Sequence, residues 1–162
     1  MLLSICIPTF NRLSCLDNCL NSILISSKNV QNFDFEVCIS DNCSEQNPIE
    51  IVNKYSKDLN IKFNRNKKNL GVALNSIETL KISKGKYAWL IGNDDLILPN
   101  TLKDLKKIFE KNLDVEYFFV NSYCLNSSDL NNYPKPFNTY ELKNKSMQTI
   151  SKFKENKRVN FW

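Results

Sequence analysis

Histidine is absent from the 162 residues of this chain, and its absence excludes several kinds of chemistry. Ser-His-Asp and Cys-His catalytic schemes both need an imidazole, as does any reaction in which histidine is the general acid or base. No two cysteines have C-x-x-C spacing, and without histidine the usual zinc ligand sets cannot be completed. Binding or catalysis must therefore depend on carboxylates, amides, hydroxyls and basic side chains.

Glycine is scarce, with three residues in the whole chain. The first apolar run is followed by Pro8-Thr9-Phe10-Asn11, where a dinucleotide-binding dehydrogenase carries G-x-G-x-x-G, and no P-loop is present. The paired acids that a receiver-type signalling domain needs after its first strand are also missing. Three common α/β classes are thereby excluded.

Long apolar runs are missing as well, since none approaches the roughly 20 residues that a membrane helix needs. The apolar start from Met1 to Ile7 is short and has no basic lead, so we expect no signal peptide and a cytoplasmic location. The six cysteines are expected to be reduced, structural thiols. The net charge of +5 comes from dispersed lysines, which indicate either an ordinary solvated surface or a mild attraction to anionic lipid or nucleotide phosphate.

Apolar runs of strand length alternate with segments of helical periodicity along most of the chain. The expected strands are Leu2–Ile7, Phe35–Ser40, Ile61–Phe63, Tyr87–Ile91 and Val115–Val120. Helices are expected after Arg12, with Ser14 and Asp17 as a capping box, and from Pro48, with the proline at the first helical position. A third helix is expected after Gly71, with Ala73, Ile77 and Leu80 on one face and Gly85 as its left-handed end. A fourth is expected from Pro99, with Leu102, Leu105 and Phe109 on one face. This alternation predicts an α/β fold with a mainly parallel sheet and helices on both faces.

Three polar clusters follow expected strands, at Pro8–Asn11, Asp41–Asn42 and Asn93–Asp95. Ligands of open parallel sheets bind beyond the carboxyl ends of the strands, so we expect these clusters to converge on one site. The adjacent carboxylates of the third cluster indicate a Mg²⁺ or Mn²⁺ ion that bridges to a diphosphate, and the alternative is a turn with a helix cap.

Two further positions leave alternatives open. A carboxylate accepts hydrogen bonds only, so Asp41 matches the N–H or O–H donors of a base or ribose, and its alternative is an Asx turn. The turn Asn69-Leu70-Gly71 precedes an expected helix whose N-terminus favours anions, and its alternative is an ordinary loop.

Taken in order, these motifs resemble those of family-two glycosyltransferases over roughly residues 1 to 120. The resemblance is carried by Ser4–Arg12, Ile39–Ser44, Asn69–Gly71 with Asn75, Gly85–Tyr87 and Gly92–Asp95. It implies a GT-A (Rossmann-like) fold and nucleotide-binding positions at Pro8, Thr9, Asn11, Asp41, Asn69, Gly71 and Asn93. The family motif is usually Asp-x-Asp, and Gly92 stands at its first acid, so Asp94 is the expected metal ligand and the role of Asp95 stays open.

The resemblance also implies an activity, the transfer of a sugar from a nucleoside-diphosphate sugar to an acceptor hydroxyl with inversion. UDP-sugar is the first choice of donor, a glycan or lipid-linked acceptor is expected, and nucleic acid is not a partner. Bacterial surface polysaccharide synthesis is the implied setting. We then expect the protein in the cytoplasm, and the alternative is peripheral association with the inner face of the membrane.

Two regions are expected, a donor-binding region over 1–120 and a loop or lid with the start of an acceptor-side region over 121–162. Residues Asn126 to Asn144 are polar and contain Pro134 and Pro136, and the last segment is basic and has helical character. The acids Asp129, Glu141 and Glu155 have no family-like context, so the catalytic base is expected beyond Trp162. A truncated or degenerate nucleotide-binding module without transferase activity is the alternative.

Overall fold

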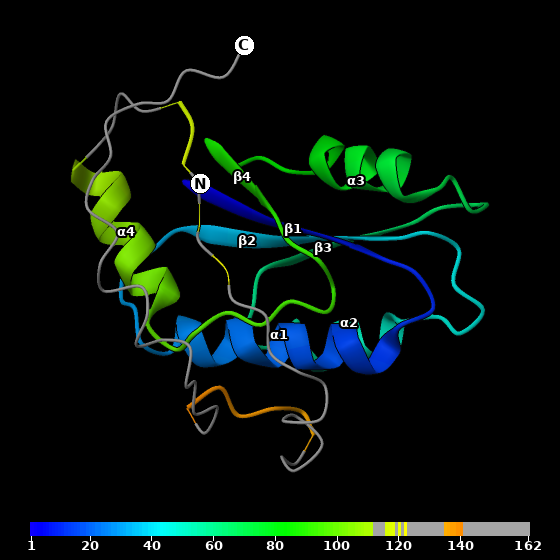
Figure 1. The fold of residues 1–162 in the computed structure, drawn as a ribbon, viewed down its shortest axis with the longest axis horizontal. Coiled ribbons are helices and arrows are strands. Elements are labelled where there is room, and N and C mark those ends of the chain that lie inside the picture. The colour runs from blue at the N-terminus through cyan, green and yellow to red at the C-terminus, as the bar shows by residue number, and fades with distance from the viewer. Residues whose placement is uncertain (112–115, 119, 121, 123–134, 141–162) are drawn as a thin grey trace.

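The computed structural model describes residues 1–111, 116–118, 120, 122 and 135–140. Strands and helices alternate along the first 111 residues, as the sequence predicts (Figure 1). In chain order they are β1 (Leu3–Thr9), α1 (Leu13–Ser27), β2 (Phe35–Asp41), α2 (Ile49–Tyr55), β3 (Ile61–Arg65), α3 (Val72–Lys81), β4 (Tyr87–Leu90) and α4 (Thr101–Lys111).

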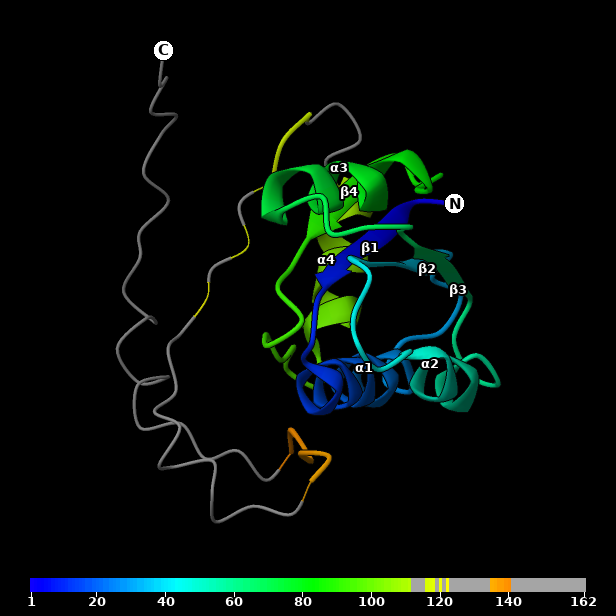
Figure 2. The same cartoon turned by 90° about the vertical axis from the view of Figure 1, so that its right-hand side faces the viewer.

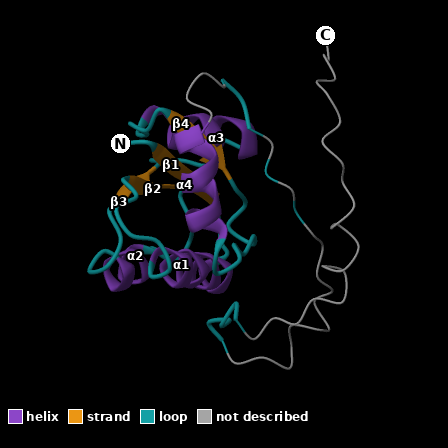
Figure 3. Ribbon diagram, turned by 90° about the vertical axis from the view of Figure 1, so that its left-hand side faces the viewer, coloured by secondary structure: helices purple, strands orange, loops and turns teal. Residues whose placement is uncertain are grey.

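The strands form one parallel sheet in the order β3-β2-β1-β4. The chain moves outward from β1 to β3 and then crosses back to place β4 on the other side of β1. The direction of winding therefore reverses between β1 and β4, which is the topological switch point where open α/β sheets bind ligands. Helix α3 covers one face of the sheet, and α1 and α2 cover the other (Figures 2 and 3). The predicted α/β class with helices on both faces is confirmed.

The main apolar core lies on the α1 side of the sheet. Alternate residues of β1 and β2 point into it, because successive side chains of a strand face opposite ways. These are Leu3, Ile5, Ile7, Val37 and Ile39, all with 1% exposure or less. They pack against Leu16, Leu20 and Ile23 of α1 and Leu102, Leu105 and Phe109 of α4, so the apolar face predicted for the last helix is confirmed.

The opposite face of the sheet is polar. It carries Ser4, Glu36 and Ser40, all with no exposed surface, together with the buried thiols of Cys6 and Cys38. Helix α3 packs on this face through Asn75 and Thr79, while its apolar residues Ile77 and Leu80 stay exposed. The helix itself is as predicted, but the face with Ala73, Ile77 and Leu80 points to solvent because the sheet beneath offers polar groups.

Three local predictions about chain geometry are wrong. Helix α1 begins at Leu13 without a side-chain cap, and Asp17 instead accepts hydrogen bonds from Tyr55 and Lys54 at 2.8 and 2.7 Å. Helix α3 ends at Lys81, and Gly85 does not adopt the left-handed conformation. Gly85 is required for space, because a Cβ atom there would lie 2.6 Å from the amide nitrogen of Ser4. Pro48 is the residue immediately before α2 and not, as predicted, its first helical residue.

The predicted strand Val115–Val120 is not present in the part of it that the structure describes, residues 116–118 and 120. The polar loop Asn126–Asn144 and the basic last segment lie outside the described residues, apart from 135–140. Residues 135–140 lie along α1, where Asn18 and Asn21 bond the amide and carbonyl of Phe137 at 3.1 and 2.9 Å. Within the described ranges no helix is long and apolar enough to cross a membrane. Cys6, Cys15, Cys19, Cys38 and Cys43 are free thiols, as predicted, and Cys124 falls outside those ranges.

Candidate nucleotide-binding site

The loops that follow β1, β2 and β4 meet at the carboxyl edge of the sheet. Thr9 and Asp41 end their strands as register partners, and the Asn42 amide donates to the Thr9 carbonyl at 2.9 Å. Asn93 reaches from the β4 loop across the switch point, and its Nδ2 donates to Thr9 Oγ1 at 2.8 Å. Two predicted site residues, Thr9 and Asn93, are thus in direct contact, and both are nearly buried.

Asn11 connects the β1 loop to the β2 loop. It adopts a left-handed conformation with φ of 51°, which asparagine tolerates better than most residues. Its amide donates to Ser44 Oγ and its Oδ1 accepts from the Glu45 amide, both at 2.8 Å. Beside it, a pocket of about 230 Å³ is lined by Asn11, Leu13, Glu45 and Gln46. Asn11 therefore shapes the edge of the site, and its contact with nucleotide stays a prediction.

Asp41 is fully buried, and its carboxylate has partners within the protein. It accepts hydrogen bonds from the amide and the hydroxyl of Ser44, at 3.1 and 2.5 Å, and it pairs with Arg65 Nε at 3.2 Å. This geometry matches the turn that the sequence left as an alternative. A nucleotide reaches this carboxylate only if the loop around Ser44 moves, and the contact of Asp41 with nucleotide stays a prediction.

Arg65 lies at the candidate site and was not among the residues that the sequence predicted there. It is the last residue of β3, and β3 pairs with β2 so that Arg65 and Asp41 are register partners. Its second guanidinium nitrogen also donates to the Ser44 carbonyl. The available signal was the basic residue at the end of a short strand, at the same edge as the other polar clusters.

A network of side-chain amides holds the loop before α3 against the strand ends. Asn42 Nδ2 donates to Asn69 Oδ1 at 2.7 Å, and Asn42 Oδ1 accepts from the Leu70 amide at 2.8 Å. Asn75 Nδ2 donates to the Ser40 carbonyl at 3.0 Å. Gly71 has φ of 82°, a conformation that favours glycine. Asn69 and Gly71 therefore lie at the same edge as the other predicted residues, in a fixed turn.

The acidic cluster after β4 divides into two roles. The amide of Gly92 donates to Asp95 Oδ2 at 2.7 Å, and the Asp95 amide donates back to the Gly92 carbonyl at 3.1 Å, so Asp95 closes a turn. Asp94 is exposed and pairs with Arg12 Nη1 at 2.8 Å. The described residues contain no group of three acidic or cysteine side chains placed to hold a metal. The exposed carboxylate of Asp94 is the one in this cluster that fits a cation whose other ligands come from a diphosphate, because the Asp95 carboxylate is engaged in the turn.

Cys19 lies beneath this cluster, with Sγ 3.9 Å from the carbonyl oxygen of Gly92. Burial, with smaller contributions from Asp95 and Asp94, raises the pKa of the Cys19 thiol far above its usual value. The thiol therefore stays protonated near neutral pH, as is typical of a buried structural cysteine.

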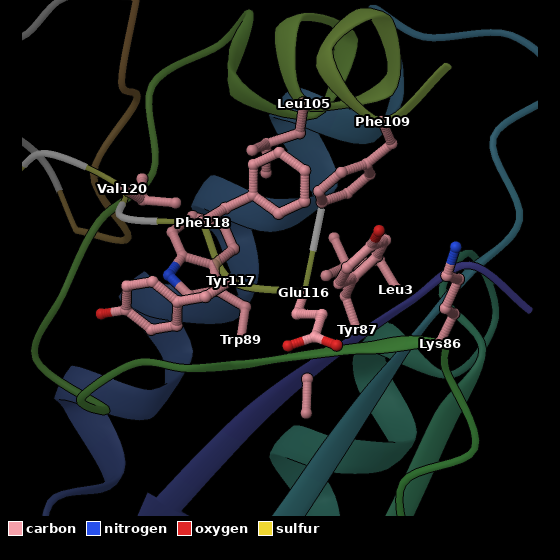
Figure 4. Close-up of a pocket in the computed structure, with 11 residues that line it drawn as sticks. Leu3, Lys86, Tyr87, Trp89, Leu105, Phe109, Glu116, Tyr117, Phe118 and Val120 are labelled. Carbon is pink, nitrogen blue, oxygen red and sulfur yellow. The ribbon is translucent and has the colours of Figure 1, made fainter. Parts of the chain in front are cut away.

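A second pocket of about 160 Å³ lies elsewhere, between the start of β4, α4 and residues 116–118 and 120 (Figure 4). Aromatic rings line much of it, and Tyr87 stacks on Phe109 with centroids 4.7 Å apart. It borders the amino-terminal half of β4, whereas the polar clusters follow the carboxyl ends of the strands. We therefore place the candidate site at the switch point and not in this pocket.

The fold and the strand-end site define a GT-A-type α/β domain, and comparison with known proteins agrees. A crystal structure of Staphylococcus aureus TarS residues 1–349 in complex with UDP-GlcNAc matches with a TM-score of 0.62 and 30% identity, over 70% of this chain and 32% of that one. A mannosyltransferase from Pyrobaculum calidifontis, solved with GDP-Man and Mn²⁺, shares the fold at 19% identity with a TM-score of 0.56.

The chain belongs to glycosyl transferase family 2, whose sequence model matches residues 4–159. The abequosyltransferase RfbV of Salmonella typhimurium is 35% identical over 117 residues, which are 71% of this chain and 34% of RfbV. The chain thus spans about a third of the length of that relative. The family and fold predictions are confirmed, and the individual site residues remain predictions.

Proposed function

We propose that this chain binds the donor of a glycosyltransferase that moves a sugar from a nucleoside-diphosphate sugar, UDP-sugar first, to an acceptor hydroxyl. The observation that carries the proposal is the convergence of three strand-end loops at the switch point, in a chain of this family. The 30% identical TarS structures with UDP and UDP-GlcNAc support the choice of UDP.

In this proposal the nucleoside lies over the β1 and β2 ends, near Thr9, Asn11 and Asp41, with Asn93 facing the ribose, and the diphosphate lies toward Asp94. The buried Thr9–Asn93 contact fixes the β1 and β4 loops relative to each other, and the loop around Ser44 moves to give the nucleoside access to Asp41. Pro8, Asn69 and Gly71 complete the proposed contacts from the neighbouring loops.

A Mg²⁺ or Mn²⁺ ion is part of the proposal, with Asp94 as its protein ligand and the diphosphate as its second source of oxygen. When bound, such an ion neutralises the negative charge of the departing diphosphate. Asp95 contributes by holding the turn that presents Asp94, since its carboxylate receives the Gly92 amide.

The acceptor side completes the proposal. A carboxylate base takes the proton of the acceptor hydroxyl, which attacks the anomeric carbon as the bond to the diphosphate breaks, so that configuration inverts. Of the carboxylates in the three strand-end clusters, Asp41 and Asp95 are held by protein donors and Asp94 by Arg12. We propose that the catalytic base lies beyond Trp162. We also propose that the enzyme acts in bacterial surface polysaccharide synthesis, in the cytoplasm or at the inner face of the membrane.

The experiment is calorimetric titration of UDP, with Mn²⁺ present, into the wild type and Asp41→Ala. We expect the variant to bind more weakly by about 1.5–3 kcal/mol, the range for hydrogen bonds to charged groups. Asp17→Ala is the matched control, because it removes a carboxylate paired with Lys54 away from the site. Equal affinities of wild type and Asp41→Ala contradict the role of Asp41, and no binding of any nucleoside diphosphate contradicts the proposed function.

The second candidate is a nucleotide-binding module that transfers nothing, favoured by the engagement of Asp41, Asp94 and Asp95, the three carboxylates of the strand-end clusters. An assay of sugar transfer by this chain, beside a longer chain that includes downstream acidic residues, decides between them. We expect efficient transfer from the longer chain only, since a general base contributes about 10²–10⁴ in rate. Full activity of the 162-residue chain places the base within it and overturns that part of the proposal.

A further inference from the structure

One ion pair joins the β1 loop to the β4 loop across the switch point. Arg12 Nη1 lies 2.8 Å from Asp94 Oδ2, and the two side chains are 58% and 57% exposed. The pair differs from the buried Thr9–Asn93 contact beside it, because solvent reaches both partners. The carboxylate proposed to hold a cation therefore already has a positive charge next to it.

The two other acids of the strand-end clusters have partners of their own. Asp41 is paired internally with Arg65, and the Asp95 carboxylate receives the Gly92 amide. Asp94 is balanced by Arg12. Arg12 therefore competes with any cation that binds the Asp94 carboxylate. A guanidinium released from Asp94 remains at the edge where a diphosphate would lie.

We propose that Arg12 is an exchangeable counter-ion: it neutralises Asp94 in the free protein and moves to the donor's diphosphate when a divalent cation takes its place. This inference rests on the proposed function and names a further donor-binding residue for the same site. Arginine suits the role because its planar guanidinium pairs with carboxylate and phosphate oxygens alike.

The exposure of the pair makes exchange easy. Exposed ion pairs are weak, so competition from Arg12 is expected to lower the affinity of Asp94 for a cation by a factor of only about two to five. A diphosphate that attracts Arg12 frees Asp94, and a cation on Asp94 frees Arg12. Binding of the two ligands is therefore linked, and by reciprocity each increases the affinity for the other.

The test measures binding and not turnover. Mn²⁺ alone is titrated by electron paramagnetic resonance, and UDP is titrated calorimetrically in EDTA and in Mn²⁺. The proteins are the wild type, Arg12→Gln, Asp94→Asn and the double variant. Lys54→Gln, which breaks an exposed ion pair with Asp17 away from the site, is the matched control. Thermal melting checks that each variant is folded.

Exchange predicts shifts of opposite sign. Arg12→Gln should bind Mn²⁺ alone about two- to fivefold more tightly and bind UDP in EDTA about tenfold or more weakly, as for a lost hydrogen bond to a charged group. Asp94→Asn should bind UDP more tightly in EDTA, because Arg12 is released, and should lose the gain from Mn²⁺. The gain in EDTA should shrink when Asp94→Asn is combined with Arg12→Gln.

A purely structural link between the two loops predicts something else. Arg12→Gln and Asp94→Asn would then weaken UDP binding by similar factors with and without Mn²⁺, or leave it unchanged, and either result overturns the inference. An unchanged gain from Asp94→Asn in the double variant also overturns it. If the wild type binds no nucleoside diphosphate at all, the proposed function fails, which is a distinguishable outcome.

Discussion

The two faces of the sheet are built by different means. On the α1 side, isoleucine, leucine and valine side chains of β1 and β2 pack against apolar side chains of the helices. On the α3 side, the same strands carry serine, glutamate and cysteine, and the buried residues of α3 are Asn75 and Thr79. Apolar burial stabilises without directional demands, whereas buried polar groups require partners in fixed positions. The α3 side therefore orders the strand-end loops, and the α1 side supplies most of the stability.

The largest effect is expected from Ile5→Ala, in the centre of β1 on the apolar side. Ile5 has no exposed surface, and removal of its buried carbons should cost about 2–5 kcal/mol in the free energy of unfolding. Urea denaturation measures the cost. Ile77→Ala on α3 is the control, because Ile77 is 46% exposed and should change stability little. Similar losses for the two variants would contradict the division between the faces.

A smaller effect with a distinct pH dependence is expected from Glu36→Gln on the polar side. Burial alone would raise the pKa of Glu36, but hydrogen bonds from Lys62, Ser4 and the Lys84 amide outweigh it and hold the pKa below its usual value of 4.5. The loss at pH 7 should be about 1–3 kcal/mol, because donors facing the carboxylate lose a charged acceptor.

The sign follows from the lowered pKa of the folded state. The Glu36 carboxylate contributes fully above the usual pKa, and its contribution disappears as the pH falls through the folded-state pKa. The difference between wild type and Glu36→Gln in urea denaturation should therefore shrink below about pH 4.5. Glu78→Gln, which breaks a more exposed pair with Lys81, is the control and should show a small difference. A gap for Glu36→Gln that grows in acid contradicts this account.

The smallest effect is expected from Asn64→Ala, which sharpens the comparison at the rim of the polar side. Asn64 Nδ2 donates to Ser40 Oγ at 3.2 Å and to Asn66 Oδ1 at 2.9 Å. Because Asn64 is half-buried, water can replace part of what is lost, and the cost in urea denaturation should be about 0.5–1.5 kcal/mol. Exposed Asn60→Ala is the control. A loss as large as that of Ile5→Ala would mean that the amide network is a main source of stability.

The sequence predicted the strands because continuous apolar runs are typical of strands covered on both sides, and it predicted the convergence of the polar clusters because parallel strands end at one edge. The pairing of charged side chains could not be predicted from the sequence. The Asp41–Arg65 pair depends on the register of β3 against β2, and the Arg12–Asp94 pair joins residues 82 positions apart. The inner face of α3 was missed because its apolar residues are the more regular pattern, and only the polar sheet beneath explains why Asn75 and Thr79 turn inward.

Gly92 lies in close contact with the two acids of the turn. A Cβ atom at position 92 would lie 2.6 Å from Asp94 Oδ1 and 3.2 Å from Asp95 Oδ2. Both oxygens are at the ends of exposed side chains, so an aspartate at position 92 requires these carboxylates to rotate aside. Because Asp94 pairs with Arg12 and Asp95 accepts the Gly92 amide, such a substitution would disturb both contacts and add a third negative charge to the turn.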